Sequence, residues 1–174
     1  MGTIRQVSTT SSVAGDRQPE VDPSAVAVLR RIFEEGFATG HTDVVDELCS
    51  PELVEHQFGL AGHGAEAIAH VKEAIRDVHT AIPDMRFTIE DTAQAGDTIW
   101  VRVRGRGTAS GPFFGPPSGR PVDVTVLDVA RVVDGRIVEH WGVPDRFALL
   151  AQTGVLDRLS QAPVGHRPPA AGDA

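Results

Sequence analysis

The stretch V122-D-V-T-V-L-D-V-A-R-V-V-D-G-R-I-V-E-H-W141 decides the fold. On both sides of Asp134-Gly135, apolar residues alternate with polar ones, which is the period of a β-strand. An Asp-Gly pair between two such runs is the strongest short signal for a hairpin closed by a two-residue type I′ turn. The stretch therefore predicts two long antiparallel strands joined at this turn.

Counting outward from the turn predicts which residues lie opposite each other in the hairpin. Val132 is expected opposite Ile137 and Val129 opposite His140, and opposed residues share a face of the sheet. One face would then carry Leu127, Val129, Arg131, Val138 and His140, and the other Asp128, Ala130, Val132, Ile137, Glu139 and Trp141. Both faces are half apolar, so the pattern does not say which of them is buried.

The rest of the chain supplies helices first and strands afterwards. Apolar residues at helical spacing predict helices at 23–40, 44–48, 64–83 and after residue 144. Alternating runs predict further strands at 54–58, 85–89 and 98–104, with His56 on the apolar face of the first. This order predicts an α+β fold in which a long antiparallel sheet curls over the helices. We expect one domain, residues 23–160, between disordered tails at 1–22 and 161–174.

Composition excludes several kinds of partner and chemistry. The formal net charge is -8, whereas nucleic-acid binding needs a concentrated basic face, so no nucleic-acid partner is expected. No run approaches the 18 apolar residues of a membrane helix. The single cysteine, Cys49, excludes an internal disulfide and fits a cytoplasmic protein. No two histidines have the His-x-x-x-His spacing of a helical metal site, so no metal is expected. The chain has neither Tyr nor Asn, which excludes a tyrosine acid and an asparagine amide.

Asp145 is the first candidate for acid/base chemistry. It follows the last predicted strand and Pro144, between the apolar residues Val143 and Phe147. In an apolar pocket the charged form of a carboxyl group is disfavoured, which would raise its pKa and make it a competent base for a carbon acid. Alternatively, Asp145 caps the closing helix, since aspartate is among the best N-caps. The two interpretations are compatible, and both stay open.

Several segments together resemble the SnoaL-like polyketide cyclases of the nuclear-transport-factor-two-like superfamily. They are A81-I-P-D-M85, A95-G-D-T-I-W-V101, L127-D-V-A-R131, D134-G-R-I-V-E-H-W141 and D145-R-F-A-L-L-A-Q-T-G154. The resemblance covers most of residues 24–156 and implies a curved sheet around a deep, cone-shaped pocket, as in ketosteroid isomerase. It also implies ring closure on a polyketide intermediate by an aspartate acid/base, without metal or organic cofactor. On this resemblance Asp145 is the acid/base and His56 is a second catalytic residue.

Two further catalytic residues are expected on the hairpin. His140 and Arg131 lie diagonally on one face of it in the predicted register, and there they could bind and polarise an enolate oxygen. For each histidine, a hydrogen-bonded position in the core or at its rim is an equally good interpretation.

Substrate-binding residues are expected on the first helix and around the hairpin. Phe33 and Phe37 lie on the helix that walls the pocket in this fold, and Trp141 and Asp128 lie on the hairpin. Phe114 lies in the long Gly- and Pro-rich loop after residue 106, whose length is typical of a functional loop, here a lid or a dimer contact.

The expected function is that of a cofactor-independent cyclase of secondary-metabolite (antibiotic) biosynthesis, acting on a small polyketide-like molecule as a homodimer. One alternative is a cycloaddition directed by pocket shape alone, in which Asp145 would matter little. Another is an epoxide hydrolase or isomerase, in which Asp128, Arg131 and Asp145 would replace the usual triad, although the Tyr and Asn that hold water there are missing. The third is a ligand-binding module without catalysis.

Overall fold

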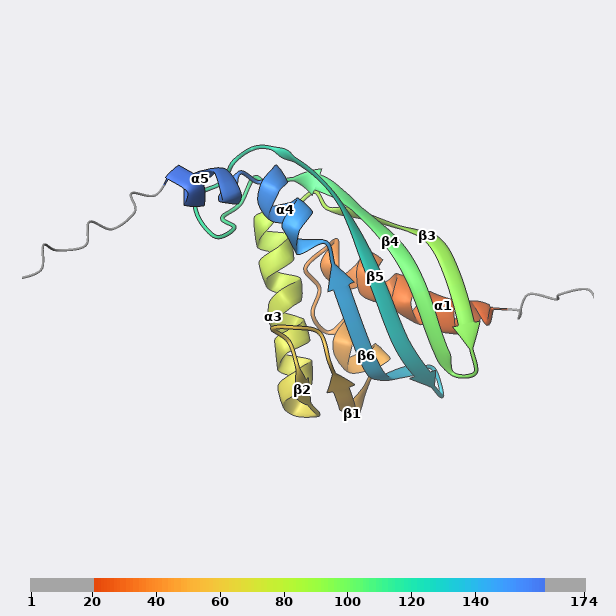
Figure 1. Cartoon of the computed structure of the whole chain (residues 1–174). Helices are drawn as coiled ribbons and strands as arrows, with labels where there is room; N and C mark the ends of the chain where they lie inside the picture. Colours follow the sequence, from red (N-terminus) through yellow and green to blue (C-terminus); the bar gives the residue numbers. More distant parts are fainter. Residues whose placement is uncertain (1–20, 162–174) are drawn as a thin grey trace, which may run out of the picture.

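The structure, a computed structural model, describes residues 21–161. The expected tails, 1–22 and 161–174, therefore lie almost wholly outside the described residues. A six-stranded sheet curves around the helices, in the order β2-β1-β6-β5-β4-β3, with α1 behind the sheet and α3 alongside it (Figure 1). This arrangement confirms the predicted α+β fold with a curved sheet.

The elements follow the predicted order, with helices concentrated in the first half and strands in the second. The helices are α1 (Pro23–Arg31), the π-helix η1 (Ile32–Phe37), α2 (Val44–Leu48), α3 (Ala65–Ala81), α4 (Arg146–Gln152) and α5 (Val155–Gln161). The strands are β1 (Cys49–Glu55), β2 (Gly62–His63), β3 (Arg86–Ala95), β4 (Thr98–Thr108), β5 (Pro121–Val133) and β6 (Arg136–Pro144). The short strand β2 has no counterpart among the predictions, and the single closing helix that the sequence predicts is divided into α4 and α5.

The first helix changes its winding halfway along. Asp22 caps α1 by accepting a hydrogen bond from the backbone nitrogen of Ser24 at 2.8 Å, as its sequence position predicts. After α1 the backbone continues as the π-helix η1, a rare form that is frequent at functional sites. Phe33 and Phe37, both in η1, pack with ring centroids 6.0 Å apart.

The predicted turn of the last hairpin is confirmed. Asp134 and Gly135 have φ angles of 49° and 73°, and positive φ at both central residues defines a type I′ turn. Next to the turn, Val132 lies opposite Ile137 as expected.

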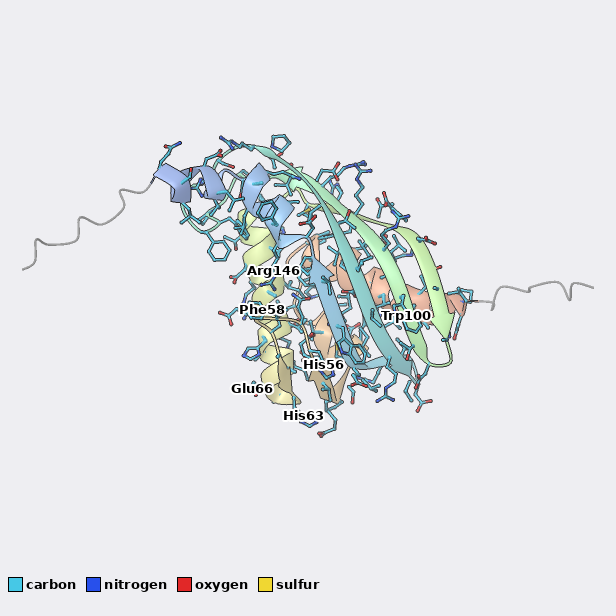
Figure 2. All side chains as sticks on the ribbon, viewed as in Figure 1. His56, Phe58, His63, Glu66, Trp100 and Arg146 are labelled. Carbon is cyan, nitrogen blue, oxygen red and sulfur yellow. The ribbon has the colours of Figure 1, made fainter. Side chains whose placement is uncertain are left out.

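Beyond this first pair the predicted register is wrong. A β-bulge leaves Val138 without a partner, so Arg131 lies opposite Glu139 and Ala130 opposite His140. Because successive side chains of a strand point to opposite faces, one extra residue transfers every later side chain of β6 to the other face. His140 therefore joins Asp128 and Ala130 on the concave face, and Glu139 and Trp141 join Arg131 and Val129 on the outer face. The outer face is seen in front in Figure 2, where Trp100 of β4 is labelled.

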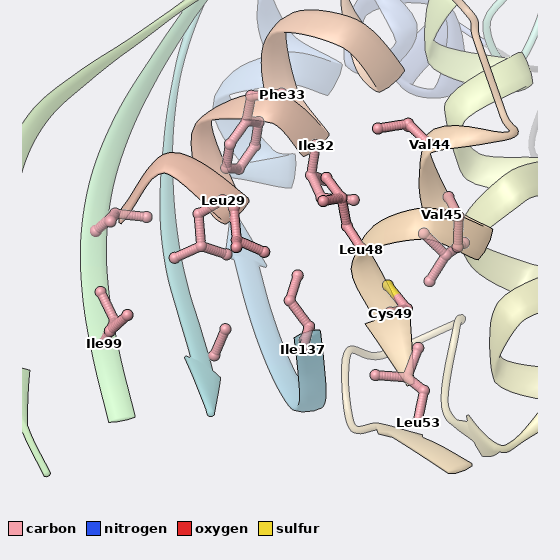
Figure 3. Packing of buried hydrophobic residues seen from close by; sticks show 14 of the residues in the cluster. Leu29, Ile32, Phe33, Val44, Val45, Leu48, Cys49, Leu53, Ile99 and Ile137 are labelled. Atoms are coloured by element: carbon pink, nitrogen blue, oxygen red, sulfur yellow. The ribbon is translucent and has the colours of Figure 1, made fainter. Parts of the chain in front are cut away.

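Two apolar clusters fill the space between helices and sheet. In the larger one, Leu29, Ile75, Ile99 and Val103 are fully buried. Figure 3 shows residues of the first helix directed at the strands that carry Ile99 and Ile137. The smaller cluster gathers where α3 ends and β3 begins, and it consists of Ala81, Ile82, Met85, Ala109, Val122 and Val124. No helix within residues 21–161 is long and apolar enough to cross a membrane.

Candidate active site

A cavity of about 780 Å³ opens between the two clusters, within the range of pockets that hold small molecules. Its walls come from the concave face of the sheet, η1, one side of α3, α4 and the loop between β4 and β5. Most of the lining is apolar, and it includes the rings of Phe33, Phe37 and Phe87, of which Phe33 and Phe87 lie 5.2 Å apart. Such a lining favours an uncharged, largely apolar ligand.

Three ionisable side chains meet on the sheet side of the cavity. The ring nitrogen Nδ1 of His140 lies 2.7 Å from Glu55 Oε2, and Nε2 lies 2.9 Å from Asp128 Oδ1. The side chains of Glu55 and Asp128 are 1% and 7% exposed. Charged groups this well buried are stable only when they are paired, and each carboxylate here is paired with the same imidazole ring.

The charge state of His140 follows from this environment. Burial alone lowers the pKa of His140, but the charge of Asp128 and the hydrogen bonds with Asp128 and Glu55 outweigh it and raise the pKa to about 10. At neutral pH the ring is therefore a cation that donates both of its N–H groups. Two carboxylates and one imidazolium leave the cluster with one excess negative charge.

The backbone explains how three distant stretches of sequence reach one point. Asp128 lies on β5 in the row of side chains that faces the cavity. His140 reaches the same side because of the bulge at Val138, and Glu55 lies beside it because β1 runs parallel to β6 with Glu55 opposite His140. Glu55 Oε1 also accepts a hydrogen bond from the backbone nitrogen of Gln57 at 2.8 Å, which fixes the chain as it leaves β1.

The cluster leaves one carboxylate oxygen free to react. Asp128 lines the cavity, and only its Oδ1 is bound to His140. Within residues 21–161, no hydrogen bond is made by Asp128 Oδ2. A carboxylate that is held by one oxygen and free at the other is well placed to accept a proton from a ligand in the cavity.

The prediction that Asp145 lies in an apolar pocket is wrong. Asp145 is exposed and does not line the cavity, although its neighbours Pro144 and Arg146 do. Its carboxylate accepts a hydrogen bond from the backbone nitrogen of Ala148 at 2.9 Å and caps α4, which is the alternative that the sequence left open. Since the side chain is turned to the helix end, it is not directed into the cavity.

His56, Arg131 and Trp141 also lie away from the cavity, on the outer face of the sheet. His56, labelled in Figure 2, stacks on Trp141 with ring centroids 4.7 Å apart. Its Nε2 lies 3.0 Å from Glu139 Oε1. Arg131 donates to the other oxygen of Glu139 at 3.1 Å. The expected pairing of His140 with Arg131 on one face fails because of the bulge. His56 lies outside because Leu53 and Glu55, not Val54, are buried at this end of β1.

Four of the predicted substrate-binding residues and the predicted catalytic residue His140 reach the cavity. Phe33, Phe37, Asp128 and His140 line it, and so does Phe114, although this side chain is 78% exposed. Phe114 packs edge-on against Phe113 of the same loop, with the ring centroids 4.8 Å apart. Of the nine predicted site residues, the structure thus places five around one cavity.

Glu55 and Gln57 line the cavity near His140 and were not predicted as site residues. The alternation in V54-E-H-Q-F58 already put them together on one face, opposite His56. Extending the run back to Leu53, which is 1% exposed, would have identified their face as the buried one. No three His, Cys, Asp or Glu side chains in the described part of the chain are arranged to hold a metal ion.

Known proteins share this sequence pattern and architecture. The model of the family described as SnoaL-like polyketide cyclase matches residues 27–153. Among solved structures, IdmH from Streptomyces antibioticus, proposed to be a polyketide cyclase, is 36% identical with a TM-score of 0.63, over 75% of this chain and 98% of IdmH. TsrD from Streptomyces laurentii is 28% identical with a TM-score of 0.65, over 78% and 98% of the two chains. No curated protein matches the chain.

Proposed function

The chain belongs to the SnoaL-like polyketide cyclase family, and on this premise we propose that it closes a ring on a polyketide-type intermediate by acid/base chemistry at Asp128. One observation carries the proposal: a buried carboxylate with a free oxygen faces an apolar cavity large enough for a small polyketide. The similar protein IdmH is proposed to be a polyketide cyclase, which supports ring closure as the reaction type.

In the proposed step, a C–H bond next to a carbonyl group breaks, its proton passes to Asp128 Oδ2, and its electron pair forms an enolate. The enolate carbon attacks a second carbonyl group of the same molecule, which forms a C–C bond and an alkoxide. The alkoxide then takes the proton back from Asp128. No other reactant is consumed, and the enzyme returns to its starting state.

The excess negative charge of the cluster moves to the substrate in this step. Before the step, Glu55, His140 and Asp128 carry one excess negative charge. When the proton passes to Asp128, that charge is carried by the enolate, so the net charge in the cavity does not change and the enolate itself needs stabilisation. The imidazolium stays bound to both carboxylates throughout, so it holds Asp128 in place without taking up or releasing a proton itself.

The cavity supplies the second part of the proposed function, which is folding the substrate chain. The rings of Phe33, Phe37 and Phe87 lie within about 6 Å of one another and offer a continuous apolar wall. Holding the two reacting carbons near each other removes much of the entropic barrier to ring closure.

Hydrogen–deuterium exchange of a model ketone tests the proposal without knowledge of the natural substrate. The native protein should accelerate exchange of the protons next to the carbonyl group of 2-tetralone in D2O, followed by proton NMR. In the variant Asp128→Asn we expect this rate to fall by roughly 100-fold or more, because the base is lost while the shape is kept.

The matched control is Asp145→Asn, the same change at the other candidate. Asparagine caps helices as well as aspartate does, so this variant should fold normally and keep the native exchange rate. Exchange that persists in Asp128→Asn and disappears in Asp145→Asn would return the acid/base role to Asp145. A native protein that closes rings without any exchange activity would favour ring closure directed by cavity shape alone.

A further inference from the structure

Gln57 lies beside the acid/base cluster, and no side-chain partner for it is found among residues 21–161. It lines the cavity just after β1, and its backbone is held on both sides: its nitrogen donates to Glu55 Oε1 at 2.8 Å, and its oxygen accepts from the nitrogen of Leu60 at 2.9 Å. Within residues 21–161, the side-chain carboxamide makes no hydrogen bond. A fixed backbone with an unengaged amide on a cavity wall is what a ligand-binding residue requires.

Gly142 provides the space in which this carboxamide lies. Gly142 is opposite Asp128 in the sheet, so both positions face the cavity. A Cβ atom on Gly142 would overlap Gln57 Oε1 and would lie 2.9 Å from Gln57 Cδ and 3.2 Å from His140 Cε1. The carboxamide therefore rests on the backbone of β6, next to the imidazolium ring and in the same row as Asp128.

Without Gln57, the acid/base cluster has no hydrogen-bond donor to offer a substrate oxygen. Carboxylates only accept hydrogen bonds, and His140 already donates both of its N–H groups to them. When a proton moves to Asp128, negative charge appears on the substrate oxygen, and a hydrogen-bond donor fixed beside that oxygen would stabilise it. The guanidinium of Arg146 also reaches the cavity lining, but it is exposed and is bound to Phe58 O at 2.7 Å.

We propose that the carboxamide nitrogen of Gln57 binds the substrate carbonyl oxygen that becomes the enolate oxygen, and that Gly142 is required because it leaves room for this side chain. This inference rests on the proposed function, and it narrows the substrate to an uncharged carbonyl compound whose oxygen lies beside the carbon acid. A substrate with a carboxylate at this point would face the excess negative charge of the cluster and is excluded.

A comparison of two bicyclic ligands tests the binding role separately from turnover. The ligands are 2-tetralone and tetralin, which have the same carbon skeleton and differ by the carbonyl oxygen. The native protein should bind the ketone about 5- to 10-fold more tightly, as measured by calorimetry, because one neutral hydrogen bond is gained. Gln57→Met, which keeps the length of the side chain and removes its donors, should abolish this preference. Gln94→Met, the same change at an amide outside the cavity, should keep it.

The same variants separate this inference from the proposed function. Asp128→Asn should lose deuterium exchange and still prefer the ketone, whereas Gln57→Met should lose the preference and show a fall in exchange kcat of roughly 100-fold. A ketone preference that survives in Gln57→Met would overturn the inference and leave the role of Asp128 untouched. A native protein that prefers the ketone and does not exchange its protons would overturn the proposed function alone.

A stability measurement checks the role of Gly142 without any ligand. In the native background, Gly142→Ala should lower the ratio of folded to unfolded protein by a few-fold, because the new methyl group displaces the carboxamide. In a Gln57→Ala background the same substitution should have little effect. Equal effects in both backgrounds would show that Gly142 does not serve Gln57 and would overturn that half of the inference.

Discussion

At neutral pH His140 carries a positive charge that a histidine in water would mostly have lost. It does so because Glu55 and Asp128 accept hydrogen bonds from its two ring nitrogens. The cation in turn makes two buried carboxylates compatible with an apolar cavity. The three side chains therefore form one electrostatic unit, and a change in any of them is expected to alter the other two.

Because the pKa of His140 is raised in the folded protein, the free energy of unfolding should depend on pH. The imidazolium contribution to stability is complete below the ordinary histidine pKa of 6.5 and is lost as the pH rises through the higher value of the folded protein. Between pH 6.5 and 9, the free energy of unfolding of the native protein should therefore fall by at least about 1 kcal/mol relative to that of His140→Gln. Urea unfolding of both proteins across this range provides the measurement. Identical pH profiles would contradict a raised pKa.

The positions of Asp128, His140 and Glu55 show which part of the site could be predicted from the sequence. Asp128 and His140 were identified from the hairpin, but each was assigned to a different face and His140 was given the wrong neighbour, Arg131. Polarity could not correct this, because both faces of the hairpin are half apolar. Glu55 was passed over because a buried carboxylate looks like a surface residue in the sequence, and only its partner His140 makes its burial understandable.

At the scale of elements, the last hairpin shows how far local rules extend. The turn was predicted because Asp134-Gly135 has a strong conformational preference of its own. The bulge at Val138 was not predicted, because the sequence alternates between apolar and polar residues in the same way whether or not the strand contains an extra residue. Only the packing of the whole sheet selects the bulged form. The π-helical winding of η1 was missed for a related reason, since apolar spacing does not distinguish it from an α-helix over six residues.

The end of β6 gives an element-scale prediction, because Asp145 caps α4. Asp145→Ala should lower the free energy of unfolding by about 1 kcal/mol, which is typical of a lost N-cap, whereas Asp145→Asn should change it by only a few tenths of that. Thermal unfolding followed by circular dichroism measures both. A large and equal loss in the two variants would show that the carboxylate charge, and not the cap, is what matters at this position.

For the whole molecule, the outer face of the sheet is the main surface that remains without an assigned role. Trp100, Leu127 and Val143 are 42%, 52% and 65% exposed there, and Leu127 and Val143 lie opposite each other in the sheet. At the edge of this apolar area, Arg131 is paired with Glu139. Exposed apolar area with a charged rim is typical of a protein interface, and two copies related by a two-fold axis would present the same area to each other. The homodimer remains a prediction.

Sedimentation velocity tests the homodimer directly. If the outer face is the interface, Leu127→Glu should shift the native protein from dimer to monomer at micromolar concentration, because a charged side chain would then replace an apolar one within the buried contact. Phe147→Glu changes another exposed apolar side chain, on α4, and it should leave the dimer intact. A native protein that sediments as a monomer at every concentration would refute the prediction.

The bulge at Val138 has a consequence for how the gene of such a protein can diverge. Most codon changes in this hairpin alter one side chain and leave the rest where they are. Loss of a single codon here would instead exchange the inward and outward residues from Glu139 to the end of β6. It would carry His140 out of the interior, and Asp128 would then lose the one side-chain partner that it has within residues 21–161. Among homologues, the length of this segment should therefore be better preserved than the identity of most residues in it.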